Sequence, residues 1–167
     1  MKFSLVFGAC LALSPFATAF AAESAQDATF VQQAAIGGMA EVQAGQVATA
    51  QATMPAVKQF GQTMVTQHTE NNQQLMTLAQ SKGLMVPAGL DASHKAEAMA
   101  LKNATGTGFD TAYITNQVAG HKAMEQVMKT EIQTGTDPDL KSFAEKTLPV
   151  VQDHLKMAEA LQPKTTP

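Results

Sequence analysis

The hydrophobic pattern of this chain is helical from Asp27 to near its C-terminal end. Apolar residues recur every three or four positions, and no stretch alternates apolar and polar residues as a half-buried strand would. Pro55 and Pro138 suit first helical turns, and Gly83 and Gly135 are placed to end helices. Five helices are predicted, with bounds near 27–52, 55–82, 92–103, 109–134 and 138–161. The pattern therefore predicts an all-α protein.

Loop lengths select the topology. Only a few residues join the first predicted helix to the second and the fourth to the fifth, so each pair forms an antiparallel hairpin. The connection between the second and fourth helices is long and contains the short helix 92–103. A four-helix bundle with one long crossover has the ferritin-like arrangement. We therefore expect a ferritin-like four-helix bundle over residues 22–162, followed by a polar tail, 163–167.

Three of the four histidines fall on apolar helix stripes. By the 3.6-residue period, His68, His121 and His154 point toward the interior of the predicted bundle. The fourth, His94, belongs to the short helix of the crossover. Interior histidines are uncommon in a purely apolar core, so these three are the first candidates for chemistry.

Two glutamates accompany these histidines. Glu125 lies one helical turn after His121, and Glu41 lies on a ribbon of small residues along the first helix. Counting from the hairpin turns places Glu41 level with His68, and places His121 within about 4.5 Å of the height of His154. The sequence leaves open whether the two hairpins share a level. If they do, every long helix brings a polar residue to one layer.

The charged residues exclude one class of function. The formal net charge is −3, and all eleven basic residues are lysine. Arginine provides the bidentate fork that phosphate recognition favours. We therefore expect no nucleic-acid partner. The spacings typical of serine nucleophiles and of phosphate-binding loops are also absent, so we do not expect an enzyme.

The segment 1–21 has the pattern of an export signal. Lys2 precedes an apolar run that ends in small residues, which predicts cleavage after Ala21, or after Ala19 as the alternative. The run could also remain as an anchor, and Cys10 raises the alternative of lipidation. After cleavage the chain has no cysteine and no transmembrane span. The predicted location is the periplasm or the outer membrane, where an envelope or protein partner is expected.

Several stretches of the chain are similar to one bacterial envelope family. They are Ala40-Glu41-Val42, Val57-Lys58-Gln59-Phe60, Met64 through His68 to Asn71 and Leu75, Lys82-Gly83, Phe109-Asp110 with Tyr113, His121 with Glu125, Leu140-Lys141-Ser142-Phe143-Ala144, Leu148-Pro149 and His154-Leu155. Their joint order and spacing resemble the family called domain of unknown function 4142. The resemblance implies a ferritin-like helical bundle in the envelope and supplies no activity. The family commonly has Asp before the first histidine, where this chain has Gln67.

Ferritin-like di-iron chemistry is disfavoured by a missing motif. Such sites use Glu-x-x-His on two helices. In this chain valine stands three positions before each interior histidine, at Val65, Val118 and Val151. A two-metal oxidase is therefore not expected.

Two interpretations of the interior polar residues remain. His68, His121, His154, Glu125 and Glu41 could supply the nitrogen and oxygen ligands of one transition-metal ion, with copper, zinc or iron as candidates. Alternatively, they form a buried hydrogen-bond network that fixes helix register, which suits a binding or structural role, such as in envelope stress. The second interpretation is the primary expectation, and the first is its alternative.

Methionine is unusually frequent for a chain of this size. Nine of the ten methionines follow the predicted signal, and thioethers suit Cu(I). They are spread over all the predicted helices without a cluster, so we interpret them as flexible core filler.

Overall fold

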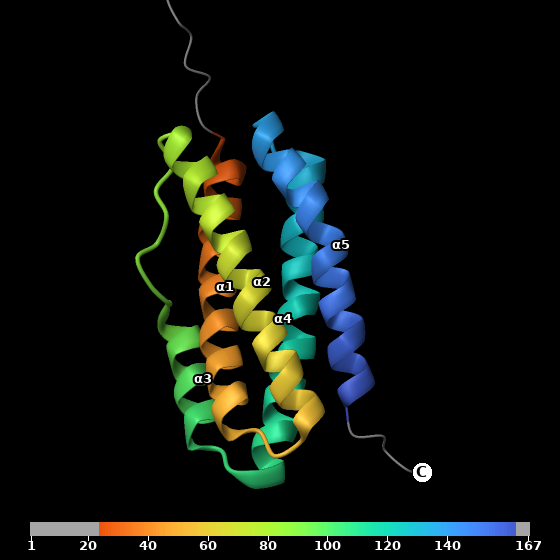
Figure 1. Cartoon of the computed structure of the whole chain (residues 1–167). Coiled ribbons are helices and arrows are strands. Elements are labelled where there is room, and N and C mark those ends of the chain that lie inside the picture. Colours follow the sequence, from red (N-terminus) through yellow and green to blue (C-terminus); the bar gives the residue numbers. More distant parts are fainter. Residues whose placement is uncertain (1–23, 163–167) are drawn as a thin grey trace, which may run out of the picture.

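The computed structural model describes residues 24–162, and these form helices without a strand. The five helices are α1 (Ala25–Gln51), α2 (Pro55–Ser81), α3 (Ala92–Asn103), α4 (Gly106–Thr134) and α5 (Pro138–Leu161) (Figure 1). The all-α prediction is confirmed. The predicted export signal and the polar tail from residue 163 lie outside the described residues. Over residues 24–162, no helix combines the length and apolarity needed to cross a membrane.

The predicted helix ends agree closely with the structure, with one correction. The fourth predicted helix was expected to begin at residue 109, after a glycine break, but α4 begins at Gly106. Gly106 has φ +59°, a left-handed conformation that glycine adopts without a steric cost, and the helix continues from there. Asp91 and Asp137 cap α3 and α5, because the Asp91 side chain accepts from His94 N and the Asp137 side chain from Asp139 N and Leu140 N.

The helices pack as two hairpins, α1 with α2 and α4 with α5 (Figure 1). Within the first hairpin, a Cβ atom at Gly45 would lie 2.7 Å from the carbonyl oxygen of Gly61, so α1 and α2 meet almost backbone to backbone. This confirms that the small-residue ribbon of α1 admits a close neighbour. The short helix α3 lies against α1, on the side away from α5 (Figure 1).

The core consists of two apolar clusters with a polar layer between them. One cluster contains Phe30, Leu75 and Phe143, and the other contains Phe60 and Tyr113, with further buried residues around each. On every helix that carries an interior histidine, that histidine falls between the residues that contribute to the two clusters. The polar layer is thus closed off by apolar residues above and below.

The methionine interpretation is wrong for most of these residues. Met64 and Met128 are buried in the core, as expected of filler. Five others are exposed: Met54, Met76, Met85, Met99 and Met157. They lie on the solvent side of their elements, where the apolar pattern alone gave no sign of their exposure.

Two buried aspartates join the hairpins to each other. Asp27, in the first turn of α1, accepts hydrogen bonds from Thr136 N (2.9 Å), Thr136 Oγ1 (2.6 Å) and Asp137 N (3.2 Å), all in the α4–α5 turn. Asp110, in the first turns of α4, accepts from Thr53 N (2.9 Å), Met54 N (3.0 Å) and the Thr53 hydroxyl, in the α1–α2 turn. Each hairpin therefore begins with a carboxylate that caps the turn of the other.

These reciprocal contacts reveal an internal repeat. The step along the chain from Asp27 to Asp110 equals the step from Thr53 to Thr136. The aromatic residues Phe60 and Phe143 are separated by the same offset. The two hairpins thus share one plan: an aspartate, a threonine turn, and an aromatic residue in the core.

The aspartate contacts predict a large stability loss on truncation. Asp110→Ala leaves two backbone N–H groups and one hydroxyl of the α1–α2 turn without their acceptor, which should lower the free energy of unfolding by about 2–4 kcal/mol in urea denaturation. Asp153→Ala is the control: among residues 24–162 this exposed aspartate has an ion pair only with Lys156, so its loss should change stability by less than about 0.5 kcal/mol. Equal midpoints for the two variants would contradict the structural role of Asp110.

A buried carboxyl beside Asp27 predicts a pH dependence of stability. Glu131 is fully buried, and burial together with the neighbouring Asp27 raises its pKa from 4.5 to about 7. Because the unfolded chain releases this proton at a lower pH than the folded chain, stability should fall as pH rises from about 4.5 to 7. We expect Glu131→Gln, which is neutral at every pH, to remove this loss, on the order of 1–2 kcal/mol. Urea denaturation of the wild type and of Glu131→Gln at pH 5 and pH 8 measures this loss. If the substitution changed the free energy of unfolding equally at both pH values, the raised pKa of Glu131 would be refuted.

Candidate metal centre

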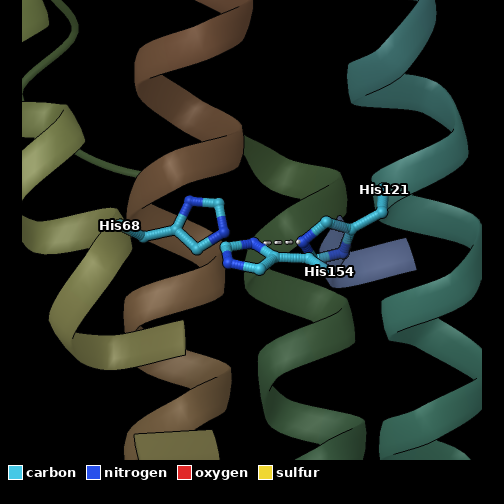
Figure 2. Close-up of side chains that lie close together, drawn as sticks. All are labelled: His68, His121 and His154. Carbon is cyan, nitrogen blue, oxygen red and sulfur yellow. Dashed lines mark hydrogen bonds between the residues drawn. The ribbon is translucent and has the colours of Figure 1, made fainter. Parts of the chain in front are cut away.

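Three histidines from three helices meet in the polar layer. His68 comes from α2, His121 from α4 and His154 from α5, and their rings converge (Figure 2). The ring centroids lie 5.6 Å apart for His68 and His121, and 5.3 Å apart for each of the other two pairs. The residues are only 7%, 1% and 2% exposed, respectively. The hairpins therefore share a level, which the sequence had left open.

Hydrogen bonds on the outside of the cluster fix two of the rings. His121 Nδ1 lies 2.9 Å from the carbonyl oxygen of Gln117, and a carbonyl can only accept, so this nitrogen carries the hydrogen. His154 Nε2 donates in the same way to Gln67 Oε1. The other nitrogens of the two rings, His121 Nε2 and His154 Nδ1, then face each other inside the cluster. Such outer partners commonly orient metal-binding histidines.

The two inward nitrogens have the spacing of metal ligands. His121 Nε2 and His154 Nδ1 lie 3.3 Å apart (Figure 2). Two nitrogens bound at about 2.05 Å to one tetrahedral ion are about 3.3–3.4 Å apart. A cation held between these two nitrogens would bond to both of them in place of the hydrogen bond that joins the rings.

His68 completes the group. Its Nε2 atom is buried, and within residues 24–162 it has no hydrogen-bond partner. A buried polar atom without a partner is costly, which makes this nitrogen a strong candidate for a ligand. One ligand atom from each of the three histidines lies within 4.8 Å of the others.

Burial keeps the imidazoles of His68 and His154 neutral. Burial, together with His121 and His154, lowers the pKa of His68 to about 3. Burial and His121 lower the pKa of His154 to about 4. The two rings therefore present lone pairs rather than positive charges at neutral pH, as metal ligation requires.

The structure separates Glu41 from this group. Its Oε1 atom lies 3.8 Å from Nδ1 of His121, the outer nitrogen of that ring, and its Oε2 accepts a hydrogen bond from Gln117 Nε2. Burial raises the pKa of the Glu41 carboxyl, with His121 and Gln117 acting in the opposite direction. Glu41 was predicted at the right level, but it contacts the back of His121 rather than the space between the rings.

Glu125 also lies outside the three-histidine group. Its Oε1 accepts hydrogen bonds from Lys129 Nζ at 2.8 Å and from Gln152 Nε2 at 2.9 Å. These contacts, Lys129 first, lower the pKa of its carboxyl. The spacing of four positions from His121 had suggested a shared face, but Glu125 sits at the edge of that face, where Lys129 one turn later engages it. The structure thus unites three of the five predicted ligands.

The other interpretation of the polar layer, a buried hydrogen-bond network, is formed in part: the inward nitrogens of His121 and His154 lie within hydrogen-bond distance, and the same two rings bond to Gln117 O and Gln67 Oε1. The Tyr113 hydroxyl is buried without a partner among residues 24–162, and Asn71 pairs with Thr147 away from the rings. Gln67 and Gln117, which do orient the histidines, were missed by the sequence interpretation. Gln117 lies one turn before His121, a spacing that could have drawn attention to it.

A pocket of about 640 Å³ reaches this centre from the surface. It lies between α1, α3 and α4, and both His68 and His121 contribute to its wall. Glu41 also lines it and is 13% exposed there. The histidine cluster is therefore accessible to small molecules or ions through one face of the protein.

The lowered pKa values of His68 and His154 predict that both rings take up a proton only at an acidic pH. In the metal-free protein, His68 and His154 should stay neutral down to about pH 5, because burial opposes their protonation. Two-dimensional NMR of 15N-labelled imidazoles measures this, with metal excluded by chelation. Titration midpoints between 6 and 7 for both rings would show that they are solvated, and would contradict the buried cluster.

The comparisons with known proteins agree with the fold and leave the chemistry open. A solved structure described as a DUF305 fragment from Deinococcus radiodurans is similar in fold, with a TM-score of 0.74 over 83% of this chain and 96% of that one, at 11% sequence identity. The search of curated proteins gave no match. The family model described as Domain of unknown function (DUF4142) matches residues 13–161. The chain therefore belongs to the DUF4142 family.

Proposed function

We propose that this protein is an exported envelope protein that binds one transition-metal ion through His68, His121 and His154. The observation that carries the proposal is the convergence of three buried imidazoles, one of which has an Nε2 without a partner among residues 24–162. Outer hydrogen bonds orient the other two rings, whose inward nitrogens lie 3.3 Å apart. These features together suit a cation better than an empty core.

The donor set narrows the choice of metal. Three neutral imidazoles suit zinc, copper and iron, and disfavour magnesium and calcium, which prefer oxygen ligands. Valine at 65, 118 and 151 replaces the glutamates of a two-metal site, so the proposal is a single ion. Zn²⁺ and Cu²⁺ are the probes of choice. The proposed role is binding rather than catalysis.

The proposal extends to architecture and location. We infer a ferritin-like four-helix bundle, in which the segment between α2 and α4, including α3, is the long crossover. Two short hairpin turns and one long connection support this inference. The export signal predicted over residues 1–21 supports a location in the periplasm or at the outer membrane.

Loss of one ring should abolish tight metal binding. We expect His68→Ala to weaken Zn²⁺ or Cu²⁺ binding by at least about 100-fold in competition with a chelating dye, because one of three ligands is lost. His94→Ala is the matched control. His94 lies on α3, pairs with the helix cap Asp91 and is not part of the three-histidine cluster. Circular dichroism of both variants verifies folding. Equal affinities for the two variants would overturn the site.

A second measurement tests the site in the cell. Protein isolated from the bacterial periplasm should carry about one equivalent of metal by elemental analysis, and the His121→Ala variant should carry far less. His121→Gln serves as a conservative alternative if the alanine variant folds poorly. Equal metal content in the wild type and in a folded variant would show that the three histidines do not hold the ion.

A further inference from the structure

We propose that the pocket between α1, α3 and α4 binds a small organic cation, an aliphatic amine, against Glu41 and beside the three-histidine centre rather than between its rings. The proposal goes beyond metal binding and does not depend on it. The inner wall of this pocket presents hydrogen-bond acceptors, its charged groups are acidic, and much of the remaining wall is apolar. These three features together define the chemistry of the ligand.

The acceptors come from Glu41 and Gln117. The Gln117 side chain donates its amide N–H to Glu41 Oε2, which fixes the orientation of the amide. Gln117 Oε1 is therefore an acceptor, and within residues 24–162 it has no partner, although Gln117 is only 2% exposed. Such an atom needs a donor. The adjacent Glu41 carboxyl is 13% exposed and lines the pocket, so a ligand with N–H groups can contact it there.

The charged residues of the pocket wall determine which sign of ligand charge the pocket favours. Three carboxylates line the pocket, those of Glu41, Asp91 and Glu97, and the described lining residues include no lysine. Asp91 pairs with His94 at 2.8 Å, whereas Glu41 has no lysine partner within residues 24–162. An anion would be repelled by the acidic wall, and an ammonium group beside Glu41 would stabilise the carboxylate form that burial disfavours.

The rest of the wall selects a ligand with a hydrocarbon part. The apolar lining residues are Ile36, Ala40, Ala44, Leu101, Met124 and Val127. A volume of about 640 Å³ lies within the usual range of small-molecule sites, about 300–1,000 Å³. A hydrated metal ion would leave this apolar surface unused. An alkylammonium ion fits both parts of the wall, with its charged end at Glu41 and its chain along the aliphatic side chains.

The experiment compares three probes of equal size and different charge. Titration of the metal-free mature chain, with EDTA present, is followed by NMR for n-butylamine, n-butanol and butyrate. We expect n-butylamine to shift the amide signals of pocket residues such as Gly37 and Gly120, and to bind at least about tenfold more tightly than n-butanol. Butyrate should not bind. Equal binding of the amine and the alcohol, or no binding of the amine, would overturn the proposal.

Matched variants locate the site. Glu41→Gln keeps the shape of the side chain and removes its charge, and should weaken n-butylamine binding at least about tenfold. Glu145→Gln removes an exposed carboxylate on α5 that does not line the pocket, and should leave it unchanged. Ala40→Phe serves as a second test if Glu41→Gln folds poorly. It fills the pocket without changing a charged residue, and it should abolish n-butylamine binding. Undiminished amine binding by either folded pocket variant would refute the assignment.

The outcome is separable from that of the metal proposal. The amine titration contains no metal, so amine binding without any metal binding in the separate assay would remove only the three-histidine site. Metal binding without amine binding would remove only the pocket proposal. The two hypotheses therefore stand or fall on different measurements.

Discussion

The carboxylates of Asp27 and Asp110 each accept hydrogen bonds from the turn of the opposite hairpin, and these contacts set the height at which the hairpins meet. His121 lies three turns along α4 from Asp110, and His68 lies about four turns along α2 from Met54, the residue that Asp110 contacts. At 1.5 Å per residue the difference in height is about 4.5 Å, within the reach of two side chains. The convergence of the imidazoles thus follows from two capped turns at the ends of the molecule.

The internal repeat contains the aspartate, the threonine turn and the core aromatic residue twice, but it does not repeat the histidines. When the offset that relates Asp27 to Asp110 is applied to His121, His68 and His154, the equivalent positions hold Gly38, Val151 and Asn71. No histidine is therefore duplicated by the repeat, and the three-histidine group does not follow the internal symmetry of the fold. Gly38 shows why its position cannot hold a ring, because even a Cβ atom there would overlap the Asn72 side chain. The two copies of the plan therefore differ at this position: α1 has a glycine packed against Asn72 where α4 carries His121.

Local features of the sequence predicted the helices and the inward direction of the histidines, because both depend on residues a few positions apart. Asp91, Asp137 and Gly83 mark helix ends through their own backbone contacts. The shared level could not be predicted, because it depends on contacts between hairpins that are far apart in the sequence. The prediction of Glu125 as a ligand was wrong for a related reason. Its spacing from His121 shows a shared helix face, but it does not show that Lys129 forms an ion pair with its carboxylate. Gln67 was overlooked because its partner, His154, lies on another helix.

His121 connects the two proposed sites, and electrostatics determine the sign of their coupling. Its Nε2 faces the other rings, while its Nδ1 lies 3.8 Å from Glu41, which lines the pocket. The negative charge of Glu41 favours positive charge on or near the His121 ring, including that of an ion bound at Nε2. A cation seated against Glu41 would neutralise this influence and repel the ion as well. Metal and amine should therefore each weaken the binding of the other, and by the same factor, because coupling between two binding equilibria is reciprocal.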